Sequence, residues 1–224
     1  MFKPLKIKRS SKFGSNFWEV FSVKENRIIQ LYGDLQYYYW ILIEADPKIR
    51  NFCESPIVPK YLKLGKEREP YFDAWILWED NSEEFIKIHR LCDLNHINSS
   101  YESTLKILNL KEKWCKENGF KFSIKTENEI KCNLVLLENL KHIISFTRNK
   151  SYEVEIDTRK VIKAVYKGLD TIIQIEQFLS EIPKYRVKEA IYWLIFKGRL
   201  LSDINIKSLS PNTKVWIQND EKIN

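Results

Sequence analysis

The order of segments between residues 69 and 126 constrains the fold of this chain more than any other feature. EPYFDAWILWED (69–80) is a strong strand that ends in an Asp-Asn turn signal, and EEFIKIHRL (83–91) follows as its antiparallel neighbour. STLKILNLKEKWCKENG (103–119) has the periodicity of an amphipathic helix, and FKFSIKT (120–126) returns to a strand pattern. A hairpin, a crossover helix and a further strand predict an α/β fold of the α+β kind, with a mixed sheet flanked by helices.

Three more segments complete this domain. FWEVFSVKENRIIQ (17–30) alternates on both sides of a polar turn and is typical of a hairpin. In residues 33–45 apolar residues recur at three- and four-residue steps, which predicts a helix with one buried face. Asp46-Pro47 ends that helix, because the residue before a proline avoids the helical region. NEIKCNLVLLENLKHIISF (128–146) is a second long helix.

The composition changes at RNKSYEVEID (148–157), which is polar and which we interpret as a linker. Beyond it three short helical segments precede two strand-like pieces, and this order is typical of a winged helix. These segments are 157–168, 170–183 and 185–198, followed by 199–204 and 213–218. We therefore expect a basic arm at residues 1–16, an α/β domain at 17–148 and a small winged-helix domain at 149–224.

Positive charge is concentrated at the beginning of the chain. Residues 1–30 contain seven Lys or Arg and two Glu, so they carry +5 of the formal net charge of +7. A basic arm on a near-neutral body is an electrostatic footprint of a nucleic-acid binder, and the alternative is a solvated tail; charge alone leaves both open. The candidate DNA-binding residues of this arm are Lys6, Lys8, Arg9 and Lys12.

The sequence also argues against several classes of protein. No run approaches the ~20 apolar residues of a membrane span, and no apolar segment follows the basic start as in a secretory signal. The four cysteines are widely scattered without a CxxC pair, which favours buried thiols in a reducing compartment. In HRLCDLNH the change from strand to loop argues against a metal cluster, although His89, Cys92, Asp93 and His96 have suitable spacing.

The hairpin formed by residues 69–80 and 83–91 is also where a metal-dependent nuclease of the restriction-enzyme type would have its active site. Such a site has an acid at the first strand, and an acid or Gln two residues before a Lys on the next strand, because positions i and i+2 share one face. A further Glu comes from the helix upstream. The carboxylates hold Mg²⁺, which stabilises charge on the phosphate and helps to generate hydroxide.

Motifs in this order run along nearly the whole chain, and together they resemble the TnsA family, the endonuclease subunit of heteromeric cut-and-paste transposases. The resemblance implies a restriction-endonuclease-like N-terminal domain and a C-terminal winged helix. The motifs read KPLKIKRSS (3–11), Gly33-Asp34-Leu35-Gln36, Leu42-Ile43-Glu44-Ala45-Asp46-Pro47, Tyr71-Phe72-Asp73-Ala74-Trp75-Ile76, Lys87-Ile88-His89, Trp114-Cys115-Lys116-Glu117-Asn118-Gly119-Phe120 and Thr126-Glu127-Asn128-Glu129-Ile130.

Carried over by residue, the resemblance assigns the catalytic positions to Gln36, Asp73, Lys87 and His89. Only Asp73 keeps the residue type of the family, so it is the single candidate ligand for Mg²⁺ or Mn²⁺. One carboxylate beside the ammonium of Lys87 makes a poor Mg²⁺ site, because Mg²⁺ prefers anionic oxygens. We therefore expect a degenerate nuclease site that holds no metal, and the alternative is an active nuclease in which Lys87 and His89 have altered roles.

The resemblance implies DNA, a DDE-type transposase subunit and an AAA+ ATPase regulator as partners, in the bacterial cytoplasm at the nucleoid. In the winged helix, Lys184, Arg186 and Lys188 open the third helix, where such domains present their recognition surface. The alternatives for these residues are a solvated face or a surface for a protein partner. A third reading of the whole chain is a winged-helix DNA-binding regulator without enzymatic activity.

Overall fold

The structure, a computed structural model, describes residues 2–5, 14–58, 61–63, 66–68, 71–148 and 154–217. The chain forms two compact units. Unit 1 comprises Met1–Ile43 and Lys48–Cys132, and unit 2 comprises Glu44–Pro47 and Asn133–Asn224. Within the described part of the chain, no helix has the length and apolar character needed to cross a membrane.

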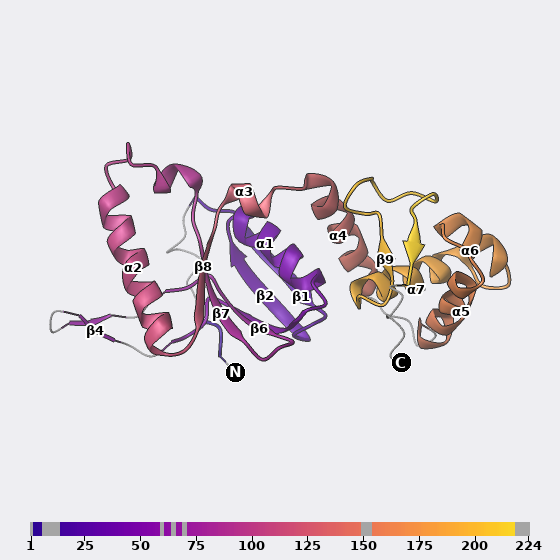
Figure 1. The fold of residues 1–224 in the computed structure, drawn as a ribbon, viewed down its shortest axis with the longest axis horizontal. Helices are drawn as coiled ribbons and strands as arrows, with labels where there is room; N and C mark the ends of the chain where they lie inside the picture. The colour runs from indigo at the N-terminus through magenta and orange to yellow at the C-terminus, as the bar shows by residue number, and fades with distance from the viewer. Residues whose placement is uncertain are drawn as a thin grey trace, which may run out of the picture. The chain divides into compact units, whose positions relative to one another are not determined.

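Unit 1 is built on a four-stranded sheet in the order β3-β6-β7-β8. The strands β3 (Ile49–Glu54), β6 (Ala74–Trp78) and β7 (Glu83–Ile88) are antiparallel neighbours. β7 pairs in parallel with β8 (Lys121–Lys125). Between them the chain passes through a 3₁₀ turn, η2 (Leu91–Leu94), and the helix α2 (Tyr101–Glu117), as Figure 1 shows. The prediction of a mixed sheet flanked by helices is confirmed.

Two hairpins and one helix flank this sheet. β1 (Phe17–Ser22) pairs antiparallel with β2 (Arg27–Tyr32), as the alternation predicted, and β4 (Tyr61–Lys63) pairs with β5 (Lys66–Arg68). The helix α1 (Asp34–Ala45) starts directly after β2, and Gly33 makes the sharp turn between them with φ +101°.

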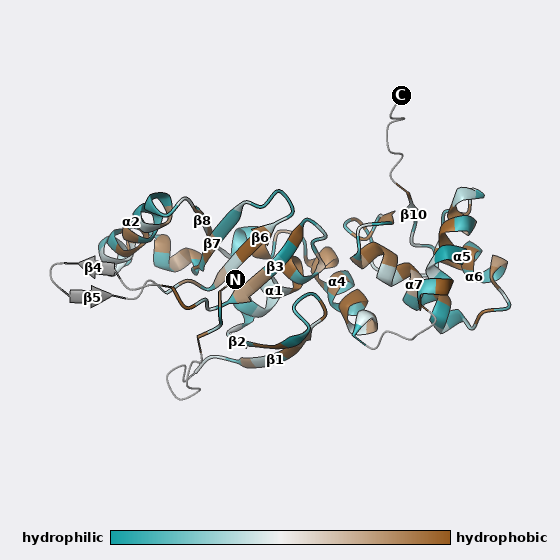
Figure 2. Cartoon of the chain, turned by 90° about the horizontal axis from the view of Figure 1, so that it is seen from below, coloured by the Kyte–Doolittle hydropathy of each residue, from teal (hydrophilic) through white to brown (hydrophobic). Residues whose placement is uncertain are grey.

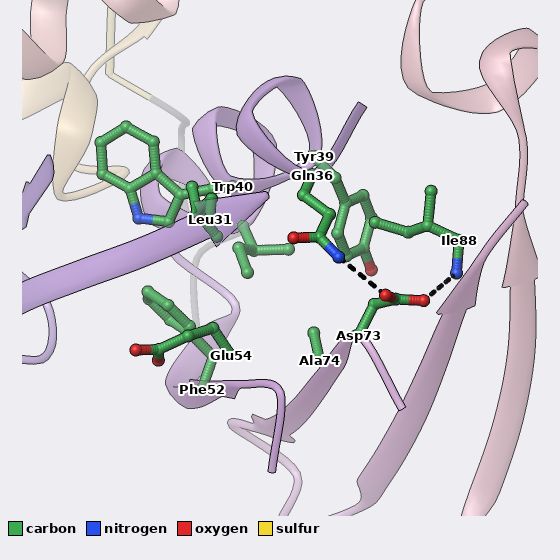
Figure 3. Close-up of a pocket in the computed structure, with 10 residues that line it drawn as sticks. Leu31, Gln36, Tyr39, Trp40, Phe52, Glu54, Asp73, Ala74 and Ile88 are labelled. Carbon is green, nitrogen blue, oxygen red and sulfur yellow. Dashed lines mark hydrogen bonds between the residues drawn. The ribbon is translucent and has the colours of Figure 1, made fainter. Parts of the chain in front are cut away.

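The two faces of the sheet pack against different helices, since side chains alternate along a strand. Trp75 and Phe85 face α2 and form an aromatic core with it, which also includes Cys53, Val58, Phe72, Trp114 and Cys115. Ala74 and Ile88 line a small cavity on the other face together with Tyr39 and Trp40 of α1 (Figure 3). In Figure 2, β6 is largely hydrophobic in colour whereas hydrophilic residues predominate on α2, in keeping with a helix that buries a single stripe.

The first residues of the expected arm belong to this fold. The ring of Phe2 lies 5.1–5.2 Å from the rings of Trp75 and Phe85. The Leu5 N–H donates to the Ser55 carbonyl at 2.8 Å, so residues 2–5 are fixed to the sheet. The candidate DNA-binding residues Lys6, Lys8, Arg9 and Lys12 lie outside the described residues, and their role stays a prediction.

The expected helix over 128–146 is two helices, α3 (Glu127–Ile130) and α4 (Leu134–Thr147). α3 begins at a capping box formed by Thr126 and Glu129. α4 has a separate N-cap, because the Asn133 side chain accepts a hydrogen bond from the Leu136 N–H at 2.9 Å. Asn133 is also the first residue of the longer segment of unit 2.

Unit 2 contains the three helices and the strand pair that the sequence predicted. α7 (Lys184–Phe196) is the most buried helix and packs against α4, α5 (Val154–Tyr166) and α6 (Ile172–Phe178). The strands are short, β9 (Leu201–Ser202) and β10 (Val215–Trp216), and a further bridge joins Thr171 to Lys214.

The division of the chain differs from the expected boundary between 148 and 149, because α4 groups with unit 2. The rings of His142 and Phe146 on α4 lie 5.8 and 5.1 Å from that of Tyr192 on α7. The buried Asn139 side chain donates to the carbonyls of Ile204 and Lys207 at 2.7 Å each, and its Oδ1 accepts from the Leu209 N–H at 2.9 Å. Long-range packing thus decides the boundary. Of the expected linker at 148–157, residues 149–153 lie outside the described residues, and residues 154–157 form the start of α5.

All four cysteines are free thiols. Cys53 and Cys115 are buried, as expected, and burial raises the pKa of each to about 12. Cys92 and Cys132 are exposed, contrary to that expectation: Cys92 lies in the 3₁₀ turn η2, which buries no residue, and Cys132 lies in the short connection between α3 and α4.

Candidate functional site

The pairing of β6 with β7 brings Asp73 and Lys87 together. Ala74 pairs with Ile86, so Asp73, one residue earlier, lies opposite Lys87, one residue later. The Asp73 N–H donates to the Ile86 carbonyl at 2.9 Å and continues the ladder. The Lys87 Nζ atom lies 2.7 Å from Asp73 Oδ2, so these two of the four predicted residues are in direct contact.

The Asp73 carboxylate accepts hydrogen bonds from three donors. Gln36 Nε2 donates to Oδ1 at 2.8 Å, whereas Lys87 Nζ and the Ile88 N–H both donate to Oδ2 at 2.7 Å. Figure 3 shows the contacts with Gln36 and Ile88 converging from α1 and β7. The Asp73 side chain is only 4% exposed, so the protein itself satisfies most of this carboxylate.

The orientation of the Gln36 amide follows from its two contacts. Its Oε1 accepts a hydrogen bond from the Tyr32 N–H at 2.9 Å, so the oxygen faces β2 and the NH₂ group faces Asp73. The sharp turn at Gly33 places the first turn of α1 directly beside the end of β2. Gln36 therefore presents a donor to the site and uses its oxygen elsewhere.

Tyr71 contacts Lys87, and Ser55 contacts Tyr71. The Lys87 Nζ atom lies 4.8 Å from the centroid of the Tyr71 ring, which is cation–π geometry. The Tyr71 hydroxyl lies 3.2 Å from Ser55 Oγ, and burial raises the pKa of Tyr71. Ser55 is buried and has φ +42°, a strained backbone conformation for a residue other than glycine. The sequence analysis predicted neither the contact of Lys87 with Tyr71 nor that of Tyr71 with Ser55.

Lys111 on α2 is a second buried ammonium that the sequence analysis missed. Its Nζ donates to the Tyr71 carbonyl at 2.6 Å and lies 5.6 Å from the centroid of the Phe72 ring. Burial, together with the charge of Lys87, lowers the pKa of Lys111 to about 8. The signal in the sequence was its place in the apolar stripe of α2, between Leu108 and Trp114.

His89 follows β7 and lies in the same cleft as the other three predicted residues. The backbone N–H of His89 donates to the Lys125 carbonyl at 3.0 Å, which extends the pairing of β7 with β8. Burial, together with the charge of Lys87, lowers the pKa of the His89 imidazole, so the ring is neutral at pH 7. A neutral imidazole at this position can accept a proton or a hydrogen bond.

The four predicted residues line one polar cleft of about 460 Å³. Further charged residues of both signs line it: Arg90 and Lys131 are basic, and Asp34, Asp93 and Glu127 are acidic. The remaining lining residues are Ser15, Tyr32, Gly33, Leu35 and Ile88. The position of Ser15 shows that the end of the expected arm (1–16) reaches the rim of this cleft.

The residues around Asp73 do not fit a divalent metal ion. Its carboxylate oxygens already accept from an ammonium, an amide NH₂ and a backbone N–H, and none of these groups is a metal ligand while it donates. Glu54 lies near Gln36, but its carboxylate is directed away from Asp73 in Figure 3 and pairs with Arg27. Across the described ranges, no group of three or more His, Cys, Asp or Glu side chains is arranged to hold a metal ion.

The predicted DNA-binding residues of α7 have different surroundings. Arg186 forms a bidentate ion pair with Asp157 of α5, at 2.8 and 3.0 Å, and this pair joins the two helices. Lys188 Nζ lies 3.7 Å from Glu176 of α6. Lys184, at the first turn of α7, is exposed. Their assignment to DNA stays a prediction, and for Arg186 the structure shows a role inside unit 2.

Comparison with known proteins gives no family for this chain. No family model matches the sequence, and no curated protein matches it.

Proposed function

We propose that the chain is a DNA-binding subunit of a transposition complex, similar to the TnsA family in the order of its parts, that does not cleave DNA by itself. The proposal joins the order of sequence motifs to the chemistry around Asp73. It assigns a binding and assembly role to a domain that resembles a nuclease.

The arrangement of elements supports the resemblance at two points. In unit 1 the helix α1, the antiparallel strands β3, β6 and β7, the crossover α2 and the parallel strand β8 follow the order expected for a restriction-endonuclease-like domain. In unit 2 the helices α5, α6 and α7 precede a strand pair, with a bridge between Thr171 and Lys214 as the third strand of a winged helix.

The observation that carries the proposal is the saturation of Asp73 by donors. In a nuclease of this type the acid at this position holds a metal ion, which needs free anionic oxygens. Here Lys87 neutralises the carboxylate at 2.7 Å, and Gln36 turns its NH₂ group toward it at 2.8 Å. A site with this charge balance stabilises the fold through its ion pair and hydrogen bonds, and it does not activate water through a metal ion.

DNA contact in this proposal comes mainly from the basic arm and from the rim of the cleft. Arg90 and Lys131 line the cleft and are exposed, and Ser15 brings the end of the arm to the same rim. In unit 2 the ion pair of Arg186 with Asp157 and the burial of α7 leave little of the third helix for a DNA groove. We therefore assign to unit 2 a contact with a protein partner, the transposase or the ATPase of the complex.

Two measurements test the proposal. The first is binding of a labelled DNA duplex by fluorescence anisotropy over a range of salt concentrations, where a steep decrease of affinity with salt is expected because phosphate contacts release counterions. The second is incubation of the purified chain with supercoiled plasmid in Mg²⁺ or Mn²⁺, with and without a DDE-type transposase. We expect binding and no nicking in either reaction.

Asp73→Asn is the variant that decides the second measurement, and Asp80→Asn, at an exposed acid in the turn after β6, is its matched control. Nicking by the natural chain that Asp73→Asn abolishes and Asp80→Asn preserves would make the chain an active endonuclease, with His89 and Lys87 in altered roles. Absence of any salt-dependent DNA binding would refute the binding role.

A further inference from the structure

The strand pair β9–β10 of unit 2 has an exposed apolar face. Val215 is buried, so the alternation of side chains along β10 directs the next residue, Trp216, outward. Trp216 pairs with Leu201 of β9, so the two side chains lie opposite each other on the same face. Trp216 is 42% exposed and Leu201 is 37% exposed. A flat apolar surface is therefore in contact with water, and a ligand with a ring gains free energy by covering it.

Backbone hydrogen bonds hold this face in place on both sides of β10. On one side the Asp203 N–H donates to the Lys214 carbonyl at 3.3 Å, which continues the pairing of β9 with β10. On the other side the Val215 N–H donates to the Asp170 carbonyl at 2.8 Å. Trp216 thus projects from a strand with fixed neighbours, so little conformational freedom is lost when a ligand packs on its ring.

Positive charge surrounds Trp216 and Leu201. Lys214 precedes Trp216 by two positions on β10, so it lies on the same face of the strand, and it is exposed. Arg199 precedes Leu201 by two positions and is exposed too, and among the described residues neither cation forms an ion pair. The one acid among residues 197–217 is Asp203, whose carboxylate accepts a hydrogen bond from the Lys214 backbone N–H at 2.9 Å. The basic residues of this segment are Lys197, Arg199, Lys207 and Lys214.

The ring of Trp216 is free of the cations that cover other aromatic rings of unit 2. The Lys167 ammonium lies 4.7 Å from the centroid of the exposed Phe178 ring, and the Lys197 ammonium lies 4.9 Å from that of Trp193. Within the part of the chain that the structure describes, no cation or aromatic ring stacks on Trp216. Its face is therefore open to a ligand.

An unpaired nucleotide fits this combination of an open indole and nearby cations. In duplex DNA the neighbouring base pairs cover both faces of each base, so an indole gains little by stacking there. In a single strand a base can stack on Trp216, while Arg199 and Lys214 attract the phosphates on either side. The excess of positive charge also disfavours a basic protein segment as the ligand.

We infer that the outer face of β9–β10 binds unpaired nucleotides of single-stranded DNA, with Trp216 as the stacking platform and Arg199 and Lys214 as phosphate contacts. The inference goes beyond the proposed function, which assigns duplex DNA mainly to the arm and the cleft rim and a protein contact to unit 2. It depends on neither of these assignments.

The test is fluorescence anisotropy of the full chain with an oligo(dT) of about 15 nucleotides and with a duplex of the same length. Trp216→Ala should weaken binding of oligo(dT) roughly tenfold or more, because one stacked base contributes at least this much. Its affinity for the duplex should equal that of the natural chain. Trp216→Phe keeps a ring and should retain most of the affinity for oligo(dT).

The phosphate contacts are tested by salt dependence. The double variant Arg199→Gln/Lys214→Gln should make the slope of log K against log salt for oligo(dT) less negative by roughly 1.4, because each phosphate contact with a single strand contributes about 0.7. An unchanged slope would contradict the assignment of these two residues.

Phe178→Ala is the matched control, since it removes an exposed ring of the same unit that Lys167 already covers. It should leave the affinity for oligo(dT) unchanged. Circular dichroism and Tm show whether each variant is folded. If Trp216→Ala is unfolded, quenching of tryptophan fluorescence by oligo(dT) decides: the natural chain should be quenched more than Trp216→Phe, because the difference reports on Trp216.

Several results would overturn the inference. They are no binding of oligo(dT), an affinity for oligo(dT) that Trp216→Ala leaves unchanged, equal losses of affinity for oligo(dT) and duplex, and equal quenching of the natural chain and Trp216→Phe. Tighter binding of oligo(rU) than of oligo(dT), with the same dependence on Trp216, would assign the face to RNA and overturn its assignment to DNA. Absence of duplex binding would refute the binding role in the proposed function and leave the results with oligo(dT) unaffected.

Discussion

Lys111→Met is the substitution whose effect follows most directly from the structure. Lys111 is a lysine of only 7% exposure on α2, with its Nζ bonded to the Tyr71 carbonyl at 2.6 Å. Burial lowers its pKa from 10.5 to about 8, so the folded state holds the proton less tightly than the unfolded state does. Methionine has a similar length and no charge, and it removes this titration.

The sign of the pH effect follows from proton binding. Below pH 8 Lys111 is charged in both states, and the folded state bears the full cost of the buried charge, on the order of 3 kcal/mol. Between about pH 8 and 10.5 the folded state loses the proton first, so unfolding takes up a proton and stability rises with pH. The natural chain should therefore gain about 2–3 kcal/mol relative to Lys111→Met between pH 7 and pH 10.

The measurement is urea unfolding of both proteins at a series of pH values, followed by tryptophan fluorescence. Only the difference between the two curves is interpreted, because cysteine and tyrosine groups titrate in both. Lys106→Met, at an exposed position of the same helix, is the control and should run parallel to the natural chain. At pH 7 Lys111→Met should be close to the natural chain in stability, since the relieved charge offsets the ~1–3 kcal/mol cost of an unpaired Tyr71 carbonyl. Parallel curves for Lys111→Met would show that Lys111 is not buried as a charged group.

Two further predictions concern the ion pair of unit 2 and the arm. Arg186→Met should destabilise unit 2 by about 3–5 kcal/mol in thermal unfolding, because Asp157 is left buried without its partner. Arg199→Met, at an exposed position, should have little effect, and equal effects of the two substitutions would show that the ion pair does not stabilise unit 2. Replacement of Lys6, Lys8, Arg9 and Lys12 by Ser should make the slope of log K against log salt less negative by roughly 3–4, as each lost phosphate contact removes about 0.9; an unchanged slope would exclude the arm from DNA contact.

The sheet of unit 1 could be predicted because its signals are local. The alternation of β6 and β7, the turn between them and the helix before β8 are all visible in adjacent residues. The same alternation placed Asp73 and Lys87 on one face, and the pairing register then set them opposite each other. These contacts depend on a hairpin of a few residues, so the sequence contained the information.

The boundary of the units and part of the site depend on long-range packing. Lys111 contacts Tyr71 across 40 positions of sequence. Its place in the apolar stripe of α2 indicates that the side chain is buried, but no local pattern identifies the Tyr71 carbonyl as its partner. The break before α4 did have a local signal, the N-cap Asn133, but the apolar pattern across it hid the boundary. Ser55 adopts φ +42° just after β3, where the sequence has no glycine that would predict a turn.

The bonds of Asn139 also have a consequence for how the chain is made. Its side chain bonds to Ile204, Lys207 and Leu209, which follow it by 65 to 70 residues. During synthesis, at ~5–20 residues per second, α4 therefore leaves the ribosome several seconds before the groups that satisfy its buried amide exist. Unit 1 has no such delay after β8, since its sheet is complete at Lys125. Nascent chains released before Leu209 should thus carry a folded unit 1 and an α4 that still exposes its apolar face, the form of this protein that a chaperone would bind.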